Sequence, residues 1–370
     1  MRPIPGTGGR RHGRPGGLMA AGLLMLAGCG AEHPNILECK DEGAVHAICG
    51  IRNVEDLAAI PNRSIVLLGQ GYGLEEEGGG SIALFDPADE SVSTAYRGGA
   101  GDETASPEPV WGDADCPGAP PASFSPHGID LAPLPDGRLR LLVVNHGGRE
   151  SIEFFEVVDR AGEPAVLWRG CAIPPETAYL NDVAGLPDGG LVTSHMMEMG
   201  THFSGTLRGL LGLNTGFVYG WQPGGEFEPL PGTEGSLPNG LQVSPDGNTL
   251  YLNLYLANRL RVLDRRTGEI LETLDIPQPD NLTWAKNGHL LVASHLGSVG
   301  DSVACMQLSE GACGMPFQIV SVDPANLSSR TIFSQSGPPM GAGTTALDLG
   351  GELLIGSFSS DRLLRVPARP

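Results

Sequence analysis

Residues 134–146, LPDGRLRLLVVNH, join an Asp-Gly turn signal to a run of apolar residues. An Asp-Gly pair before such a run is typical of a β-hairpin that leads into a buried strand. Five more segments carry the same signature, with Asn-Gly or Gly-Gly in some of the turns. They are IPNRSIVLLGQGY from Ile60, LPDGGLVTSHM from Leu186, SPDGNTLYLNLY from Ser244, AKNGHLLVASH from Ala285 and DLGGELLIGSF from Asp348. The chain therefore contains six copies of one turn-and-strand unit.

The spacing of the six copies indicates how they are arranged. Their starts lie roughly 57 residues apart on average, and a unit of that length holds about four strands with their loops. Seven blades would need shorter units, and a stacked solenoid would show a shorter and stricter period. No long linker divides the body of the chain. The sequence thus predicts an all-β fold, a six-bladed β-propeller with a central tunnel over residues 51–370, preceded by an N-terminal tether over residues 29–50.

The composition limits the partners of the protein. The 370 residues include 23 Lys and Arg against 43 Asp and Glu, which gives a net charge of −20 at pH 7. Such a balance argues against binding of nucleic acid or of an anionic membrane surface. Hydrophobic residues make up 40% of the chain, enough for a large core, while 55 Gly and 31 Pro disfavour a mainly helical protein. Divalent cations are natural partners of so acidic a body.

The N-terminus has the pattern of an export signal. Arg10, Arg11 and Arg14 precede the apolar run at residues 18–27, which is too short to cross a bilayer comfortably. The run closes with Leu-Ala-Gly-Cys, which resembles the lipobox of bacterial lipoproteins. We therefore predict a signal peptide over residues 1–28, a lipid on Cys29, and an exported lipoprotein held to a membrane only by that lipid. Gly30 gives no inner-membrane retention signal, which favours the outer membrane. The alternative is an ordinary secretion signal that happens to contain a cysteine.

Six cysteines remain after Cys29, an even number in a chain predicted to reach an oxidising compartment. Disulfides are therefore expected, although six cysteines allow 15 connectivities. No Cys-x-x-Cys is present, so a zinc or redox site has little support. Two pairs are close enough in sequence to close short loops and leave a third pair over: Cys39 with Cys49, Cys305 with Cys313, and Cys116 with Cys171.

Well-known catalytic motifs are absent from the sequence, which has no Gly-x-Ser-x-Gly, His-Glu-x-x-His or P-loop. It has instead a polar residue or pair at or near the start of several predicted strands. In a propeller the innermost strand of each blade faces the tunnel, so these side chains can converge, and converging oxygen donors form a calcium site. The residues are Glu55 and Asp56, His127, His146, Asn181 and Asp182, Asn239, and Asp280 and Asn281.

Adjacent pairs sharpen this prediction, because successive side chains on a strand point to opposite faces. Glu55 and Asp56 would diverge, as would Asn181 and Asp182, so one pair can serve two metal ions at different depths. The alternative interpretation is that these residues are turn-forming Asx side chains and solvated carboxylates.

Seven segments of the chain together resemble the paraoxonase/arylesterase family of calcium-dependent lactonases. They occur in the family's order and at compatible spacing. The resemblance implies a six-bladed propeller with two Ca²⁺ ions in its tunnel and hydrolysis of a small lactone or aryl ester. The segments are VEDLAAIPN (54–62), FSPHGIDL (124–131), LLVVNHGGRESIEFFEV (141–157), YLNDVAGLPDG (179–189), PNGLQVSPDG (238–247), DNLTWAKNGHLLVASH (280–295) and GTTALDLGGELLIGSF (343–358).

The same resemblance implies roles for individual residues. His127 would activate water, His146 would orient or relay through it, and His295 near the tunnel mouth would contact substrate. Glu55 is a competing base. The implied ligands of the catalytic calcium are Glu55, Asn181, Asn239, Asp280 and Asn281, and those of the structural calcium are Asp56, Asp182 and the backbone carbonyl of Ile129.

Departures from the family pattern leave the substrate open. Asn258 stands where the family has a further active-site histidine, and residues 196–216 at the tunnel mouth diverge. The chain also ends without a cysteine, so the family's disulfide between the two ends cannot form. Two alternatives remain: a gluconolactonase-like enzyme, a group that typically uses one metal, and a non-catalytic propeller that keeps calcium for stability.

Overall fold

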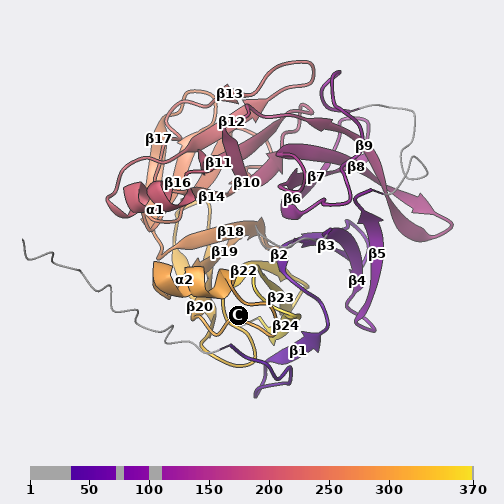
Figure 1. Ribbon diagram of the computed structural model, residues 1–370, viewed down its shortest axis with the longest axis vertical. Helices are drawn as coiled ribbons and strands as arrows, with labels where there is room; N and C mark the ends of the chain where they lie inside the picture. The colour runs from indigo at the N-terminus through magenta and orange to yellow at the C-terminus, as the bar shows by residue number, and fades with distance from the viewer. Residues whose placement is uncertain (1–34, 72–78, 100–110, 369–370) are drawn as a thin grey trace, which may run out of the picture.

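The computed structural model describes residues 35–71, 79–99 and 111–368. Its strands form six antiparallel sheets of four strands each, arranged in a ring (Figure 1). One edge strand of each sheet contacts the corresponding edge strands of the sheets on both sides. These six innermost strands form a closed circle. The prediction of a six-bladed β-propeller is therefore confirmed.

The first three blades each take four consecutive strands from the chain. Blade one contains β2 (Val54–Ala59), β3 (Val66–Gln70), β4 (Ser81–Asp86) and β5 (Ser91–Arg97). Blade two contains β6 (Pro126–Pro133), β7 (Leu139–Asn145), β8 (Ser151–Arg160) and β9 (Glu163–Ala172). Blade three contains β10 (Ala178–Gly185), β11 (Leu191–Glu198), β12 (Phe217–Trp221) and β13 (Glu228–Pro229), with helix α1 (His202–Leu210) inserted after β11.

Blades four and five follow the same order, and blade six differs in its last strand. Blade four contains β14 (Pro238–Val243), β15 (Thr249–Leu254), β16 (Arg259–Asp264) and β17 (Ile270–Asp275). Blade five contains β18 (Pro279–Trp284), β19 (Leu290–His295), β20 (Phe317–Val322) and β21 (Ser329–Gln335), with helix α2 (Val299–Met306) after β19. Blade six contains β22 (Gly343–Asp348), β23 (Glu352–Ser357), β24 (Arg362–Pro367) and the N-terminal strand β1 (His46–Cys49).

The repeated turn signal connects the innermost strand of a blade to the second strand. Gly137 between β6 and β7 has φ +87°, and Gly247 between β14 and β15 has φ +72°. These left-handed conformations strongly favour glycine, which explains why Asp-Gly recurs at this point of the repeat.

The two ends of the described chain close the ring together. Strand β1 pairs antiparallel with β24, with Ile48 opposite Leu363. The buried guanidinium of Arg362 donates to the backbone oxygens of Ile36 (3.0 Å) and Pro339 (3.1 Å). The sixth blade thus takes its outermost strand from within the 29–50 segment.

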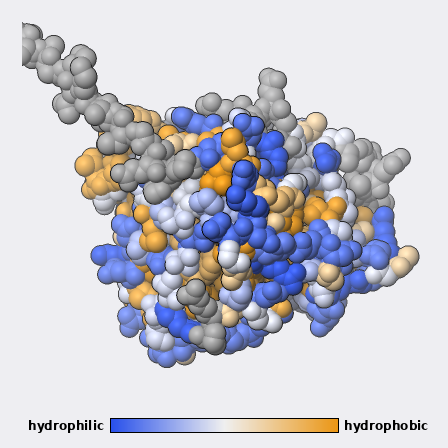
Figure 2. All heavy atoms as spheres, turned by 90° about the horizontal axis from the view of Figure 1, so that it is seen from below, coloured by the Kyte–Doolittle hydropathy of each residue, from blue (hydrophilic) through white to orange (hydrophobic). Residues whose placement is uncertain are grey.

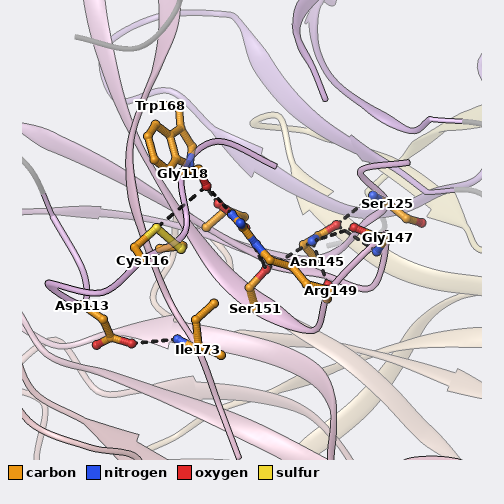
Figure 3. Close-up of polar contacts among 12 residues, drawn as sticks. Asp113, Cys116, Gly118, Ser125, Asn145, Gly147, Arg149, Ser151, Trp168 and Ile173 are labelled. Atoms are coloured by element: carbon orange, nitrogen blue, oxygen red, sulfur yellow. Dashed lines mark hydrogen bonds and ion pairs between the residues drawn. A yellow bond between two sulfur atoms is a disulfide. The ribbon is translucent and has the colours of Figure 1, made fainter. Parts of the chain in front are cut away.

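Three disulfides are present, and they are the three pairs singled out in the sequence: Cys39–Cys49, Cys116–Cys171 and Cys305–Cys313. The Cys116–Cys171 bridge fixes the segment that leads into blade two against the end of β9, and the Asp113 carboxylate beside it accepts a hydrogen bond from Ile173 N (2.8 Å; Figure 3).

The core lies between neighbouring blades and the surface is polar. Between blades one and two, for example, Tyr96 packs edge-on against Phe124 and Phe155 at centroid distances of 5.6 and 4.7 Å. Seen from below, hydrophilic residues cover much of the molecule, with hydrophobic patches between them (Figure 2). None of the helices in the described ranges has the length and hydropathy needed to cross a bilayer. The predicted signal peptide and Cys29 lie outside the described residues.

Candidate metal and histidine site

Several of the predicted site residues lie at breaks in the strand pairing. In every blade, the pairing of the innermost strand with the second strand slips by one residue near its start, and in blade three a second slip in the opposite sense, between Tyr179 and Leu180, precedes it. Such β-bulges redirect side chains and are common beside active sites. The residues inside the six breaks are Glu55, His127 with Gly128, Asn181 with Asp182, Asn239 with Gly240, Asp280 with Asn281, and Thr344.

Four buried oxygens in these breaks have no hydrogen-bond partner. They come from four different blades: Glu55 Oε2, Asn181 Oδ1, Asn239 Oδ1 and Asn281 Oδ1. A buried acceptor without a partner costs free energy and calls for an explanation. Carboxylate and amide oxygens are the ligands that Ca²⁺ prefers, so this set fits a hard cation.

Other atoms of these side chains are hydrogen-bonded to one another. Asn281 Nδ2 donates to Glu55 Oε1 (2.7 Å), which joins blade five to blade one. The Asn239 side chain is hydrogen-bonded to Asp280. In the described ranges, no three His, Cys, Asp or Glu side chains group closely enough to hold a metal by themselves. A cation here would therefore depend on the asparagine oxygens as much as on the two carboxyl groups.

The electrostatics of the site favour a positive charge. Burial, followed by repulsion from Asp56 and Asp280, raises the pKa of Glu55. Burial also raises the pKa of Asp280 to about 8 and that of Asp56 to about 7. Several carboxyl groups are thus crowded in one low-dielectric region, where a divalent cation would stabilise their charged forms.

Asp56 and Asp182 each bridge to the next blade. Asp56 Oδ2 accepts from Ile129 N (2.9 Å), and Asp182 Oδ2 accepts from Leu241 N (2.8 Å). Burial and then the charge of Asp56 raise the pKa of Asp182. These carboxyl groups therefore join neighbouring innermost strands. Each also accepts a hydrogen bond from the backbone N–H of the residue that follows it, Leu57 or Val183.

Two glycines make this close packing possible, and sequence reasoning missed them. A Cβ on Gly128 would lie 2.5 Å from Asp182 Oδ1, and a Cβ on Gly240 would lie 2.5 Å from the Cα of Asn281. The signal was available in the sequence, because each glycine directly follows a predicted site residue.

His127 lies against the predicted metal ligands. Its Nε2 is 3.1 Å from Asn181 Nδ2 and 3.7 Å from Glu55 Oε1. Burial of the ring, followed by the nearby His146, lowers the pKa of His127 well below its usual range. His127 is therefore a neutral imidazole at pH 7, able to accept a proton.

His146 is adjacent to His127, with ring centroids 4.9 Å apart. Its other face stacks on Tyr179 at 4.9 Å, and Tyr179 contacts the ring of His202, the first residue of α1. The 196–216 segment, which diverges from the family pattern, thus reaches the histidine side of the site through α1. Its Phe203 side chain is 85% exposed.

His295 approaches the site from the opposite side and is only 2% exposed. Its Nε2 lies 3.4 Å from Asp280 Oδ2, and its Nδ1 lies 2.9 Å from the Tyr255 hydroxyl, which reaches Ser302 of α2 at 3.2 Å. Burial lowers the pKa of His295 to about 4, so the ring is neutral. His295 is thus buried and contacts the Asp280 carboxyl group.

Comparison with known proteins gives the family. The arylesterase family model matches residues 115–364. Human serum paraoxonase/arylesterase 2 is 22% identical over 243 residues, which cover 64% of this chain and 67% of the human protein. Human serum paraoxonase/arylesterase 1 is 25% identical over 243 residues, covering 64% and 66%. The matched part of the chain thus spans about two thirds of the length of these relatives.

Solved structures show the same fold. A gluconolactonase from Xanthomonas campestris superposes with a TM-score of 0.51 at 14% identity, covering 91% of this chain and 98% of that protein. A luciferin-regenerating enzyme gives a TM-score of 0.51 at 15% identity, covering 88% and 95%. The family match begins after Glu55 and Asp56, and it includes the other predicted site residues from His127 to His295. It extends over more than half of the sequence and confirms the resemblance found there: the chain belongs to the arylesterase family.

Proposed function

We propose that this protein is a calcium-dependent hydrolase of lactones and aryl esters. Family membership indicates a hydrolase that acts on lactones or esters. The observation that supports calcium dependence and a histidine base is the group of four unpartnered oxygens from four blades, with His127 beside them.

Residues at and beside the bulges would hold the proposed ions, and the unpartnered oxygens belong to the first of them. Glu55, Asn181, Asn239, Asp280 and Asn281 would hold the catalytic ion. Asp56, Asp182 and the carbonyl of Ile129 would hold a second, structural ion. Bound calcium supplies a Lewis acid that polarises the substrate carbonyl and stabilises the oxyanion.

The protein's own residues supply the proton transfer and the positioning. The lone pair of His127 Nε2, between Asn181 and Glu55, takes a proton from the attacking water. His146, whose ring lies next to that of His127, orients this base or relays its proton. His295 and Tyr255 fix the orientation of Asp280 on the opposite side of the site.

The test is hydrolysis of a panel of lactones and phenyl acetate by the protein from Gly30 onward, with calcium and with excess chelator. We expect turnover with calcium, loss of turnover with chelator, and recovery when calcium is returned. Turnover that chelator leaves unchanged would contradict the calcium dependence. No turnover of any substrate, with calcium bound, would instead support a binding propeller.

A one-metal sugar lactonase of the gluconolactonase type is the second candidate. The observation that favours it is that Asp56 and Asp182 are already hydrogen-bonded to backbone N–H groups, so they leave less need for a second ion. Calcium content per protein after gel filtration separates the two: two ions support the first proposal and one ion supports the second.

Export and lipidation at Cys29 belong to the same proposal. Three disulfides in the described part of the chain support an oxidising compartment outside the cytoplasm. We expect intact-mass analysis of the membrane fraction to give a chain that begins at an acylated Cys29. A mature chain that starts elsewhere and keeps an unmodified Cys29 would contradict this.

A further inference from the structure

Glu150 is a carboxyl group at the site that the sequence analysis did not single out. It lies in the loop between β7 and β8, four residues after His146, and its side chain is 10% exposed. Its Oε2 lies 2.9 Å from His146 Nδ1, and its Oε1 accepts from Leu180 N at 2.6 Å. One carboxylate therefore ties the His146 loop of blade two to the residue directly before Asn181 in blade three.

The loop that carries Glu150 is fixed on both sides. The Asn145 side chain accepts from Ser125 N and Gly147 N, both at 2.9 Å, and donates to Arg149 O and to Ser151 Oγ (Figure 3). Arg149 in turn donates to Gly118 O (2.7 Å; Figure 3). Because its neighbours are held in this way, Glu150 is not a freely moving surface carboxylate.

Close packing adds to this rigidity. A Cβ on Gly147 would lie 1.6 Å from the backbone oxygen of Ser123, so the loop rests directly on the chain segment below it. Gly148 follows with φ +75°, a conformation that favours glycine. The two glycines turn the chain sharply enough to bring Glu150 back over His146.

The contact with Glu150 determines the tautomer of His146. A carboxylate only accepts hydrogen bonds, so Nδ1 of the neutral ring must carry the hydrogen. Nε2 then has a lone pair, and it is buried without a partner. The same reasoning gives the same tautomer to the neighbouring ring: the amide nitrogen of Asn181 can only donate, so His127 Nε2 accepts and His127 carries its hydrogen on Nδ1. The His127 ring thus has a donor at Nδ1, and the adjacent His146 ring has an acceptor at Nε2.

We propose that Glu150 is a positioning residue that holds His146 in the tautomer with hydrogen on Nδ1, and so keeps His146 Nε2 as an acceptor beside His127. When His127 takes a proton from water at Nε2, His146 Nε2 can then accept the hydrogen on Nδ1 of the resulting imidazolium, and His127 returns to the neutral state. This inference rests on the proposed hydrolytic function, and it assigns a role to a residue of this chain that lies outside the metal ligands.

The test compares three substitutions. Glu150→Ala removes both acceptors, and Glu150→Gln keeps the size but offers one acceptor for two donors. Glu153→Gln is the matched control, because Glu153 is a buried carboxyl three residues further on, in β8, that contacts Arg149, Ser151 and Trp168. We expect kcat to fall about 10- to 100-fold in Glu150→Ala, less in Glu150→Gln, with little change in KM. Glu153→Gln should keep the wild-type kcat.

Two readouts separate positioning from a purely structural role. Long-range ¹H–¹⁵N NMR spectra of the His146 ring should show hydrogen on Nδ1 in the wild type and a shift towards Nε2 in Glu150→Ala. In a His146→Ala background, Glu150→Ala should cost almost nothing further, because the two residues act as one unit. An unchanged tautomer, or equal losses in both backgrounds, would overturn the proposal. A wild-type protein without turnover would defeat the proposed hydrolase, while the NMR result would still decide the role of Glu150.

Discussion

Asn239→Ala is expected to lower turnover by about 100-fold or more and to weaken calcium binding in proportion. The substitution removes a buried Oδ1 that has no partner in the protein, together with the amide that bonds to the Asp280 side chain. The substitution leaves four of the five residues proposed to bind the catalytic calcium. The ion that offsets the repulsion between Glu55 and Asp280 is then held less tightly. The measurement is calcium affinity by titration calorimetry, beside kcat on the best lactone of the panel.

Two further variants control for this result. Asn239→Asp keeps an oxygen at the same position, so it should retain most of the calcium affinity. Asn287→Ala removes an exposed asparagine whose side-chain oxygen only accepts from His289 N in a surface turn, so it should behave as the wild type. If Asn239→Ala binds calcium and hydrolyses the lactone like the wild type, the assignment of this oxygen to the metal is wrong.

Much of the fold could be predicted because the signal is local. A tight turn and the strand beside it are encoded within a dozen residues, and the repeat shows this unit six times, three of them with Asp-Gly. The pairing of β1 with β24 could not be predicted in the same way, because it joins residues more than 300 positions apart, as His46 with Arg365. Short strands at chain ends carry little periodicity, so their partner depends on the closed ring itself.

For the candidate site, too, local features could be predicted and long-range geometry could not. The polar residues at the strand starts could be found, since residue type and position in the repeat are visible in the sequence. Their geometry could not, because a one-residue slip in pairing decides which way a side chain points. Glu150 was missed for a related reason: its contact with His146 requires the sharp turn at Gly147 and Gly148, and its contact with Leu180 comes from another blade.

Asp182→Ala is expected to give the largest loss of stability. The carboxyl accepts from Val183 N within its own bulge and from Leu241 N of the next blade, both at 2.8 Å. Two buried N–H groups would lose their acceptor, at about 1–3 kcal/mol each, or about 2–6 kcal/mol together. Urea unfolding, followed by the fluorescence of the four tryptophans, measures this loss.

Asp182→Asn separates the hydrogen bonds from the proposed ion, because asparagine keeps one acceptor and removes the charge. Without calcium, Asp182→Asn should lose less stability than Asp182→Ala, because it keeps one of the two acceptors and relieves the repulsion from Asp56. With calcium at about 100 times its Kd, each bound ion should add about 2.7 kcal/mol to the wild type.

Asp182→Asn and Asn239→Ala should each lose the part of the calcium gain that comes from one ion, and the double variant should lose all of it, because the two groups of ligands are different. If Asp182→Asn keeps the full gain while Asn239→Ala loses all of it, a single ion binds in the tunnel. The role of Asp56 and Asp182 would then be to join the blades by hydrogen bonds alone.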